Sequence, residues 1–278
     1  MMKKYIERIT TESNLSKQEA IWLLEHICKK KHLHVSVNTL TPGQEQLLTN
    51  YLNQIIHEHK PLAYIIGWIP FLDLQINVRP PVLIPRPETE EWVHQIIEKL
   101  SPYKDTIKKI LDIGTGSGAI ALSLAKSFPN AQIMATDINI EALTLAQENA
   151  VLNKIKNINF LKSNLFEKLE GQKFDLIVSN PPYIPENMNK TLAPSVMQWE
   201  DPQALFSGTE GLDILKTILQ EGQSHLISNQ GLSFQLVLEI DITQYESLKI
   251  LTEKHDWNCS ITKDLFGNWR TMWCTKNP

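Results

Sequence analysis

Short apolar segments alternate with helical ones from about residue 107 to the end of the chain, and this alternation restricts the possible folds more than any other feature. Five segments rich in apolar and β-branched residues are predicted to be strands, at residues 110–113, 132–136, 158–161, 174–179 and 232–240. Helical segments, such as residues 119–126 and 140–152, lie between them. Strands that alternate with helices pair in parallel and are covered by helices on both faces. The sequence therefore predicts an α/β fold with a twisted, mostly parallel sheet.

The first part of the chain has a helical pattern instead. Ser16 with Glu19, and Thr41 with Gln44, have the spacing of capping boxes, and apolar residues follow each at helical intervals. Residues 64–85 have an extended pattern broken by Gly and Pro, which is typical of a hairpin-like connector. We expect a small helical domain over residues 1–75, a connector and interdomain segment over 76–106, and the α/β domain over 107–278. Because the helical segment holds no group of residues able to do chemistry, its expected task is to dock a partner.

The composition argues against several classes of protein. A net charge of −4 over 278 residues implies no broad basic face, so direct binding to nucleic acid is not expected. No stretch has the length and apolarity of a membrane span, and the N-terminus lacks the apolar segment of a secretory signal. The three cysteines, Cys28, Cys259 and Cys274, are far apart and form no CxxC pair. We therefore expect reduced intracellular thiols, with no disulfide and no metal site.

The first predicted strand of the α/β domain runs into a glycine-rich turn, Gly114-Thr115-Gly116-Ser117-Gly118. Glycine lets the backbone approach a ligand without a Cβ in the way, and the start of the following helix offers free N–H groups. The turn alone is weak evidence, because together with Ala119 it also satisfies the dinucleotide pattern G-x-G-x-x-[G/A]. A nicotinamide-dependent oxidoreductase therefore stays open on this motif.

Polar residues follow the next two predicted strands. Asp137 is placed where a carboxylate can accept hydrogen bonds from both hydroxyls of a ribose, a feature that NAD and S-adenosylmethionine sites share. Its alternative role is to cap the helix ahead of Asn139. At the end of the third strand, Asn164 could accept from an adenine amino group while Leu165 covers the ring, or the two residues could form a simple turn.

The strand over residues 174–179 ends in a stretch that separates these chemistries, Asn180-Pro181-Pro182-Tyr183. Proline has no N–H and a fixed φ, so the strand stops there and a stiff loop with free carbonyl groups follows. The Asn180 side-chain oxygen and the Pro181 carbonyl can accept both N–H groups of a planar NH2, against which Tyr183 can pack. Such a nitrogen attacks a methyl sulfonium poorly, and two acceptors hold it in line as positive charge develops. The loop thus favours a methyltransferase acting on a planar nitrogen, with a Pro-rich turn capped by Asn as the plain alternative.

With both motifs on one chain, the sequence resembles the HemK/PrmC family, the release-factor glutamine N(5)-methyltransferases. The resemblance runs from about Pro61 to Arg270 and rests on residues 61–67 (PLAYIIG), 83–90 (LIPRPETE), 111–121 and 179–184. It implies a Rossmann-like class I methyltransferase with a seven-stranded, mostly parallel sheet and S-adenosyl-L-methionine as cofactor. It also implies that the substrate is the Gln side chain of the Gly-Gly-Gln motif in a class I peptide chain release factor, which the helical first domain would bind.

The resemblance also implies roles for individual residues. Asn180, Pro181 and Tyr183 would be catalytic, and the substrate would contact Asn180 to Tyr183, including Pro182. We expect the cofactor to contact a larger set, made up of Gly114, Thr115, Gly116, Ser117, Gly118, Asp137, Asn164, Leu165 and Asn180.

This sequence departs from the family pattern in several places. Asn164 stands where the family usually has Asp, and Leu165 where a Trp occurs, so the adenine contacts are less secure. Residues 238–241 (LEID) replace the bacterial Leu-Glu-x-Gly, and residues 200–202 (EDP) replace Glu-Pro. Both variants resemble the mitochondrial branch, so we expect an intracellular protein of the mitochondrial matrix, with the cytoplasm as the alternative because no transit peptide is visible.

Two questions stay open at this level. A nucleic-acid adenine N(6)-methyltransferase also acts on a planar amino group, but it would need a basic surface and a way to flip the base. The net acidity of the chain disfavours it. In addition, Arg86 or Glu88 could line the substrate mouth, or they could belong to a helix start at Pro87, where the dipole favours carboxylates. Capping is the expected role.

Overall fold

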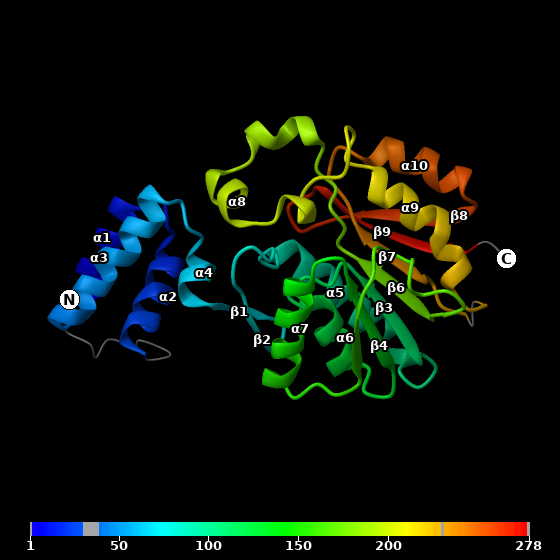
Figure 1. Ribbon diagram of the computed structural model, residues 1–278, viewed down its shortest axis with the longest axis horizontal. Helices are drawn as coiled ribbons and strands as arrows, with labels where there is room; N and C mark the ends of the chain where they lie inside the picture. Colours follow the sequence, from blue (N-terminus) through cyan, green and yellow to red (C-terminus); the bar gives the residue numbers. More distant parts are fainter. Residues whose placement is uncertain (1, 30–38, 229–230, 277–278) are drawn as a thin grey trace.

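The computed structural model describes residues 2–29, 39–228 and 231–276. A group of helices lies at one end of the molecule and a helix-covered sheet at the other, with a short hairpin between them (Figure 1). The N-terminal group comprises α1 (Met2–Glu12), α2 (Lys17–Cys28), α3 (Pro42–His57) and α4 (Leu62–Ile66).

The N-terminal helices have their own start signals and their own core. Both predicted capping boxes form, because Ser16 and Thr41 each accept from a backbone N–H while Glu19 and Gln44 bond back to the cap residue. The inward-facing side chains make a hydrophobic cluster distinct from those of the sheet, with Ile9, Leu23, Leu24, Leu48 and Leu52 at most 1% exposed.

A two-stranded hairpin links this group to the rest of the chain. Strands β1 (Trp68–Phe71) and β2 (Leu74–Asn77) pair antiparallel. Gly67, with a φ of 85°, ends α4, and the hairpin after it confirms the hairpin-like pattern expected within residues 64–85. Asn149 of α7 (Ile140–Leu152) and Asn153, the C-cap of that helix, accept the backbone N–H groups of Asn77 and Gln75. The hairpin is therefore fastened to the helical layer of the sheet.

The sheet has the strand order β5-β4-β3-β6-β7-β9-β8. Its parallel part consists of β3 (Lys109–Ile113), β4 (Gln132–Asp137), β5 (Ile158–Lys162), β6 (Leu176–Ser179) and β7 (Leu236–Glu239). The antiparallel edge consists of β8 (Trp257–Lys263) and β9 (Trp269–Lys276). The predicted strands are confirmed, although β6 and β7 are shorter than expected. Phe174 pairs only through an isolated bridge to Leu226, and the ladder between β6 and β7 begins at Leu236.

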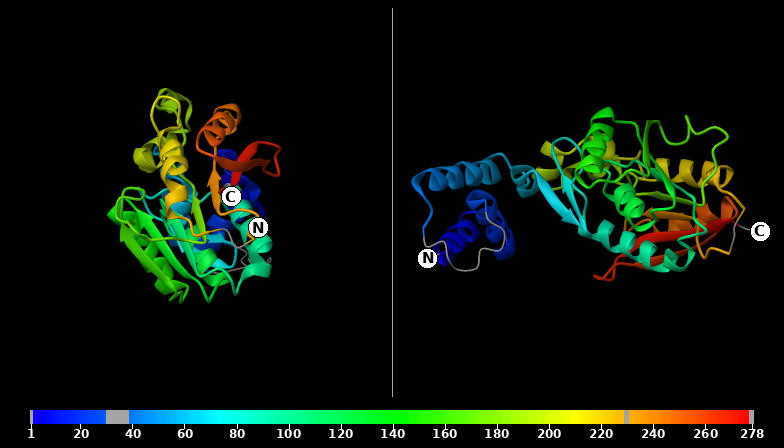
Figure 2. Two further views of the ribbon diagram at one scale, coloured as in Figure 1. Left: turned by 90° about the vertical axis from the view of Figure 1, so that its right-hand side faces the viewer. Right: turned by 90° about the horizontal axis from the view of Figure 1, so that it is seen from below.

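Helices cover both faces of this sheet (Figures 1 and 2). One layer contains α5 (Pro87–Leu100), α6 (Ala119–Ser127) and α7, and the other contains α9 (Asp213–Gly222) and α10 (Tyr245–Lys254). The short helix α8 (Pro194–Trp199) lies in the long connection between β6 and α9.

The central strands fill two hydrophobic cores at once. In β6, Leu176 and Val178 pack in the cluster of α5 and α6, whereas Ile177 packs in the cluster of α9 and α10. Side chains alternate across a strand, so a strand covered on both faces must be apolar at consecutive positions. This burial explains why the sequence of the central strands is continuously apolar, and it makes the edge where they end a rigid support.

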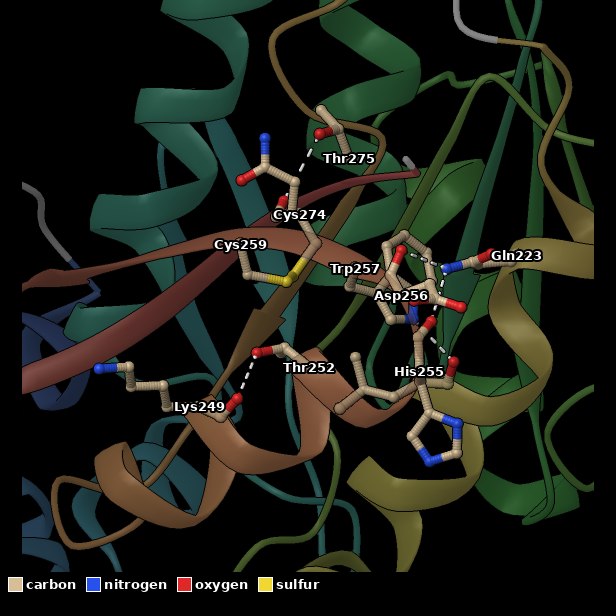
Figure 3. The surroundings of a disulfide bond; sticks show 11 residues. Gln223, Lys249, Thr252, His255, Asp256, Trp257, Cys259, Cys274 and Thr275 are labelled. Carbon is tan, nitrogen blue, oxygen red and sulfur yellow. Dashed lines mark hydrogen bonds between the residues drawn. A yellow bond between two sulfur atoms is a disulfide. The ribbon is translucent and has the colours of Figure 1, made fainter. Parts of the chain in front are cut away.

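The prediction of reduced thiols was wrong for Cys259 and Cys274. Cys259 of β8 and Cys274 of β9 lie directly opposite each other, with their Cα atoms 4.1 Å apart, and a disulfide joins them (Figure 3). The two residues are 15 positions apart in the sequence and are brought together only by the antiparallel pairing of these strands. Sequence spacing therefore gave no sign of the pair.

Candidate functional site

A cavity of about 460 Å³ opens where β3, β4, β5 and β6 end. Parallel strands bring their carboxyl ends to one edge of a sheet, where ligands of α/β proteins bind. The volume is within the range of roughly 300–1,000 Å³ that is typical of small-molecule sites. All but one of the predicted cofactor and substrate residues line it: Gly114, Thr115, Gly116, Ser117, Asp137, Asn164, Leu165, Asn180, Pro181, Pro182 and Tyr183. The structure thus brings together residues from four strand ends.

The glycine turn and Asp137 hold each other in place. Gly116 has a φ of 57°, and its N–H donates to Asp137 Oδ2 at 2.8 Å. The other carboxylate oxygen, Oδ1, accepts the N–H of Asn139 at 2.8 Å. Burial raises the pKa of Asp137, and the backbone N–H donors oppose that rise. Asn139 is the N-cap of α7, so Asp137 is not the capping residue.

Gly118 is the predicted cofactor residue that is not among those lining the cavity. It is the N-cap of α6 and has a φ of 87°. A Cβ at this position would lie 3.0 Å from the Cβ of Ala146 in α7. Gly118 therefore permits close packing of two helices behind the turn, and its contact with the cofactor stays a prediction.

Asp112 is a buried carboxylate that sequence reasoning missed. It lies inside β3 and is fully buried, where its Oδ2 accepts the Thr115 hydroxyl at 2.7 Å. Burial raises the pKa of Asp112 to about 7, and the hydrogen bond from Thr115 opposes the rise. Its Oδ1 has no hydrogen-bond partner among the described residues. The sequence signal that could have identified Asp112 is an acidic residue in the middle of an apolar strand.

The end of β5 is shaped by a tight turn. Leu165 has a positive φ of 46°, and the Ser163 hydroxyl donates to its carbonyl at 3.0 Å. The exposed Asn164 donates through Nδ2 to Glu167 Oε1 at 2.8 Å. This bond uses the NH2 group, so the carboxamide oxygen is the atom of Asn164 available to a hydrogen-bond donor.

Hydrogen bonds hold the loop after β6 on two sides. The Asn180 NH2 donates to the Thr89 hydroxyl at 3.1 Å, and the Tyr183 hydroxyl donates to Glu239 at 2.9 Å. The Tyr183 carbonyl accepts from Gln244 Nε2 at 3.1 Å. The loop lines the same cavity as the glycine turn, as the predicted chemistry requires.

Two further segments complete the cavity wall, and Arg86 is the one residue in them that was considered for the site from the sequence. One includes Val82, Leu83, Pro85, Arg86 and Thr89, and the other falls between Leu192 and Phe206. Arg86 joins the two segments through an ion pair with the buried Glu200. Burial raises the pKa of Glu200, and Arg86 opposes that rise. Of the two residues left open above, Arg86 lines the cavity, whereas Glu88 lies in the first turn of α5.

Comparison with known proteins decides between the chemistries that this site allows. A family model, the methyltransferase small domain, matches residues 94–249. Over 257 residues the chain is 41% identical to the release factor glutamine methyltransferase of Lactococcus lactis subsp. lactis, which covers 91% of this chain and 92% of that protein. The chain belongs to the release factor glutamine methyltransferase family. A member from Thermodesulfovibrio yellowstonii is 33% identical and covers 96% of this chain and 95% of its own length.

Membership of the release factor glutamine methyltransferase family confirms the predicted fold and chemistry. The chain is a class I methyltransferase that uses S-adenosylmethionine, and the nicotinamide alternative is excluded. The same fold occurs in an rRNA methyltransferase of T. thermophilus solved with AdoMet and guanosine. That structure has a TM-score of 0.55 and 18% identity, and the match covers 76% of this chain and 50% of that one.

The relatives also bear on the compartment. Both are bacterial proteins, so they give no support to the mitochondrial matrix that two sequence variants suggested. Within the part of the chain that the structure describes, no helix combines the length and apolarity needed to cross a bilayer.

Proposed function

We propose that this chain methylates the side-chain amide nitrogen of the Gln in the Gly-Gly-Gln motif of a class I peptide chain release factor. The observation that carries the proposal is that the Asn180–Tyr183 loop and the glycine turn line one cavity. A methyl donor held at the turn and an amide held at the loop would therefore meet. The names of the relatives from Lactococcus lactis and Thermodesulfovibrio yellowstonii support the same substrate.

The cavity residues fit S-adenosylmethionine. Gly114 and Gly116 have positive φ values, and a Cβ at either would meet nothing within 4 Å, so the turn faces open space. We assign the ribose hydroxyls to Asp137 and the adenine to Asn164 and Leu165, with Thr115, Ser117 and Asn180 as further contacts. When bound, the cofactor supplies a methyl group on a positively charged sulfur.

The substrate residues then act by position and by accepting hydrogen bonds. Asn180 Oδ1 and the Pro181 carbonyl accept the two N–H groups of the Gln amide, while Pro182 stiffens the loop and Tyr183 shapes the pocket. Bound at the glycine turn, S-adenosylmethionine would supply its methyl group to the amide nitrogen: a C–N bond would form as the C–S bond breaks, and the sulfur would keep the electron pair of that bond. The nitrogen then releases one proton to water. Two acceptors favour the pyramidal, positively charged nitrogen of the transition state, which raises the rate.

We assign the release-factor-binding role to the helical domain of residues 1–75, with residues 76–106 as connector and 107–278 as the methyltransferase domain. The N-terminal helices have a hydrophobic cluster separate from those of the sheet, which supports this division. We further propose that the partner is protein rather than nucleic acid or membrane. The bacterial origin of the relatives favours the cytoplasm over the mitochondrial matrix.

Transfer of a tritiated methyl group tests the substrate. We expect labelling of a class I release factor with an intact Gly-Gly-Gln motif and none of the same factor with that Gln replaced by Ala. Equal labelling of both would refute the proposal. Labelling of bare DNA or RNA instead would support the adenine N(6)-methyltransferase alternative.

Asp137→Ala is expected to weaken cofactor binding about tenfold or more, because hydrogen bonds to charged groups contribute about 1.5–3 kcal/mol each. Isothermal titration with S-adenosylmethionine measures the effect. Asp213→Ala, at an exposed acidic residue in the first turn of α9, is the matched control. A fall in turnover with unchanged cofactor affinity would contradict the assignment of Asp137.

A further inference from the structure

Behind the Asn180–Tyr183 loop lies a chain of hydrogen bonds for which the cofactor and substrate motifs do not account. Asn180 Nδ2 donates to Thr89 Oγ1 at 3.1 Å, and Thr89 Oγ1 donates to Glu239 Oε2 at 2.6 Å. Trp92 Nε1 donates to the same oxygen at 2.8 Å, and the Tyr183 hydroxyl donates to Glu239 Oε1 at 2.9 Å. Both loop residues that face the substrate site are thus connected to one carboxylate.

The fold explains why these residues meet. Strands β6 and β7 pair in parallel with Ser179 opposite Leu238, so the next residues, Asn180 and Glu239, lie at the same edge of the sheet. Thr89 and Trp92 are three residues apart on α5 and therefore face the same side. The helix places both of them against Glu239.

The carboxylate determines the direction of every bond in this chain. An ionised Glu can only accept, and the side chain of Glu239 is 1% exposed, so its charge is compensated by the three donors around it. Burial and the charge of Glu239 raise the pKa of Tyr183 well above its ordinary value, so its hydroxyl keeps the proton that it donates.

Because Glu239 fixes Thr89 as a donor, it also fixes the hydrogen-bond roles of Thr89 and Asn180 toward each other. A hydroxyl group has one hydrogen, and that of Thr89 is given to Glu239. Only oxygen lone pairs of Thr89 remain for Asn180, and these can accept from its NH2 but cannot donate to its oxygen. The two ends of a carboxamide are nearly equal in shape, so hydrogen-bond partners decide which end points where.

We propose that Glu239, acting through the Thr89 hydroxyl, keeps the Asn180 carboxamide in the orientation that presents its oxygen to the substrate amide. Thr89 and Glu239 are then positioning residues. The inverted carboxamide would set its NH2 against the NH2 of the substrate, two donors facing each other. The inference rests on the proposed function, because only a substrate that donates hydrogen bonds requires the oxygen.

Thr89→Val tests the proposal, since Val has the shape of Thr without the hydroxyl. With an apolar group in place of the Thr89 hydroxyl, the NH2 of Asn180 loses its acceptor, and the productive orientation becomes less favourable. We expect kcat on the release factor to fall about tenfold or more, with the Kd of S-adenosylmethionine within about twofold of wild type. Thr89→Ser, which restores the hydroxyl, should recover most of the lost kcat.

Thr252→Val is the matched control. Thr252 is also a buried helical threonine, and its hydroxyl donates to the Lys249 carbonyl at 2.9 Å (Figure 3). It is not among the residues that line the cavity, so its replacement should leave kcat unchanged.

A double-mutant comparison tests whether Glu239 acts through Thr89. A Gln at position 239 can donate to Thr89 and so allow the inverted chain. We expect Glu239→Gln to lower kcat strongly in the wild-type background and clearly less in the Thr89→Val background, where only its bonds to Trp92 and Tyr183 are left to perturb. A loss of the same size in both backgrounds would overturn this route.

A spectroscopic measurement tests the orientation of the Asn180 carboxamide without requiring turnover. In 15N-labelled protein saturated with S-adenosylhomocysteine, the carboxamide resonances of Asn180 are identified by their loss in Asn180→Ala. We expect slow hydrogen exchange of this NH2 in wild type and Thr89→Ser, and fast exchange in Thr89→Val.

Three outcomes would each overturn the proposal. They are equal exchange rates in wild type and Thr89→Val, equal kcat values for these two proteins, and an equal loss of kcat in Thr89→Val and Thr89→Ser. Failure of the wild-type protein to label the release factor would instead refute the proposed function, while the exchange measurement would still test the orientation.

Discussion

Asn180→Ala is expected to lower turnover about a hundredfold or more while leaving the affinity for S-adenosylmethionine nearly unchanged. In the proposed function the Asn180 oxygen accepts from an amide whose N–H groups become more acidic as methyl transfer proceeds, so the bond would be strongest in the transition state. Removal of a bond of this kind costs on the order of 2–4 kcal/mol of transition-state stabilisation. Single-turnover kinetics with a release factor, together with titration of the cofactor, measures the two quantities separately.

The control for this change is Asn130→Ala. Asn130 is exposed in the turn before β4, at the opposite edge of the sheet, where it donates to Asp105. Its replacement should leave both turnover and cofactor affinity unchanged. Turnover near that of wild type in Asn180→Ala would show that the Asn180 oxygen does not hold the substrate.

Gly211→Ala is expected to destabilise the protein by several kcal/mol and to reduce turnover in the molecules that remain folded. Gly211 has a φ of 71°, and a Cβ there would lie 2.1 Å from the Tyr183 carbonyl oxygen. Gln244 Nε2 donates to the carbonyl groups of both Gly211 and Tyr183, so neither backbone segment can move freely. The left-handed conformation costs Ala about 1–2 kcal/mol, and overpacking typically adds about 1–3 kcal/mol. Urea denaturation measures the free energy of unfolding.

Gly171→Ala separates the conformational cost from the overpacking cost in the stability lost by Gly211→Ala. Gly171 has the same φ of 71°, but a Cβ there would meet nothing within 4 Å. We expect it to lose only the conformational part, about 1–2 kcal/mol, with full activity. If Gly171→Ala and Gly211→Ala lost equal stability, contact with the substrate loop would not be the reason that position 211 requires glycine.

The site elements that could be predicted are those at the ends of strands. Asp137 and Asn180 were expected at one edge of the sheet because each follows an apolar strand of a parallel type, and parallel strands end at the same edge. The capping boxes at Ser16 and Thr41 were predictable for a similar reason, since both partners lie within three residues of each other.

The elements that could not be predicted depend on contacts between distant segments. Thr89 and Glu239 are 150 residues apart in the sequence, and nothing local to either indicates that they meet. Cys259 and Cys274 meet only through the pairing of β8 with β9, and the expectation of reduced thiols failed because that pairing was not foreseen. The hairpin at residues 68–77 was expected from its extended pattern, but its docking on α7 was not, because the two segments are far apart in the sequence.

The sequence by itself determined which backbone conformations are possible and which chemical groups the strand ends present. Glycines at Gly114 and Gly116 allow the left-handed turn, and Pro181 and Pro182 end the strand, because these are properties of the residues themselves. Only the tertiary structure decided which partner the NH2 group of the Asn180 carboxamide binds. A hydrogen bond has a direction that its partners set, and those partners, Thr89 and Glu239, arrive from α5 and β7 only when the two layers pack.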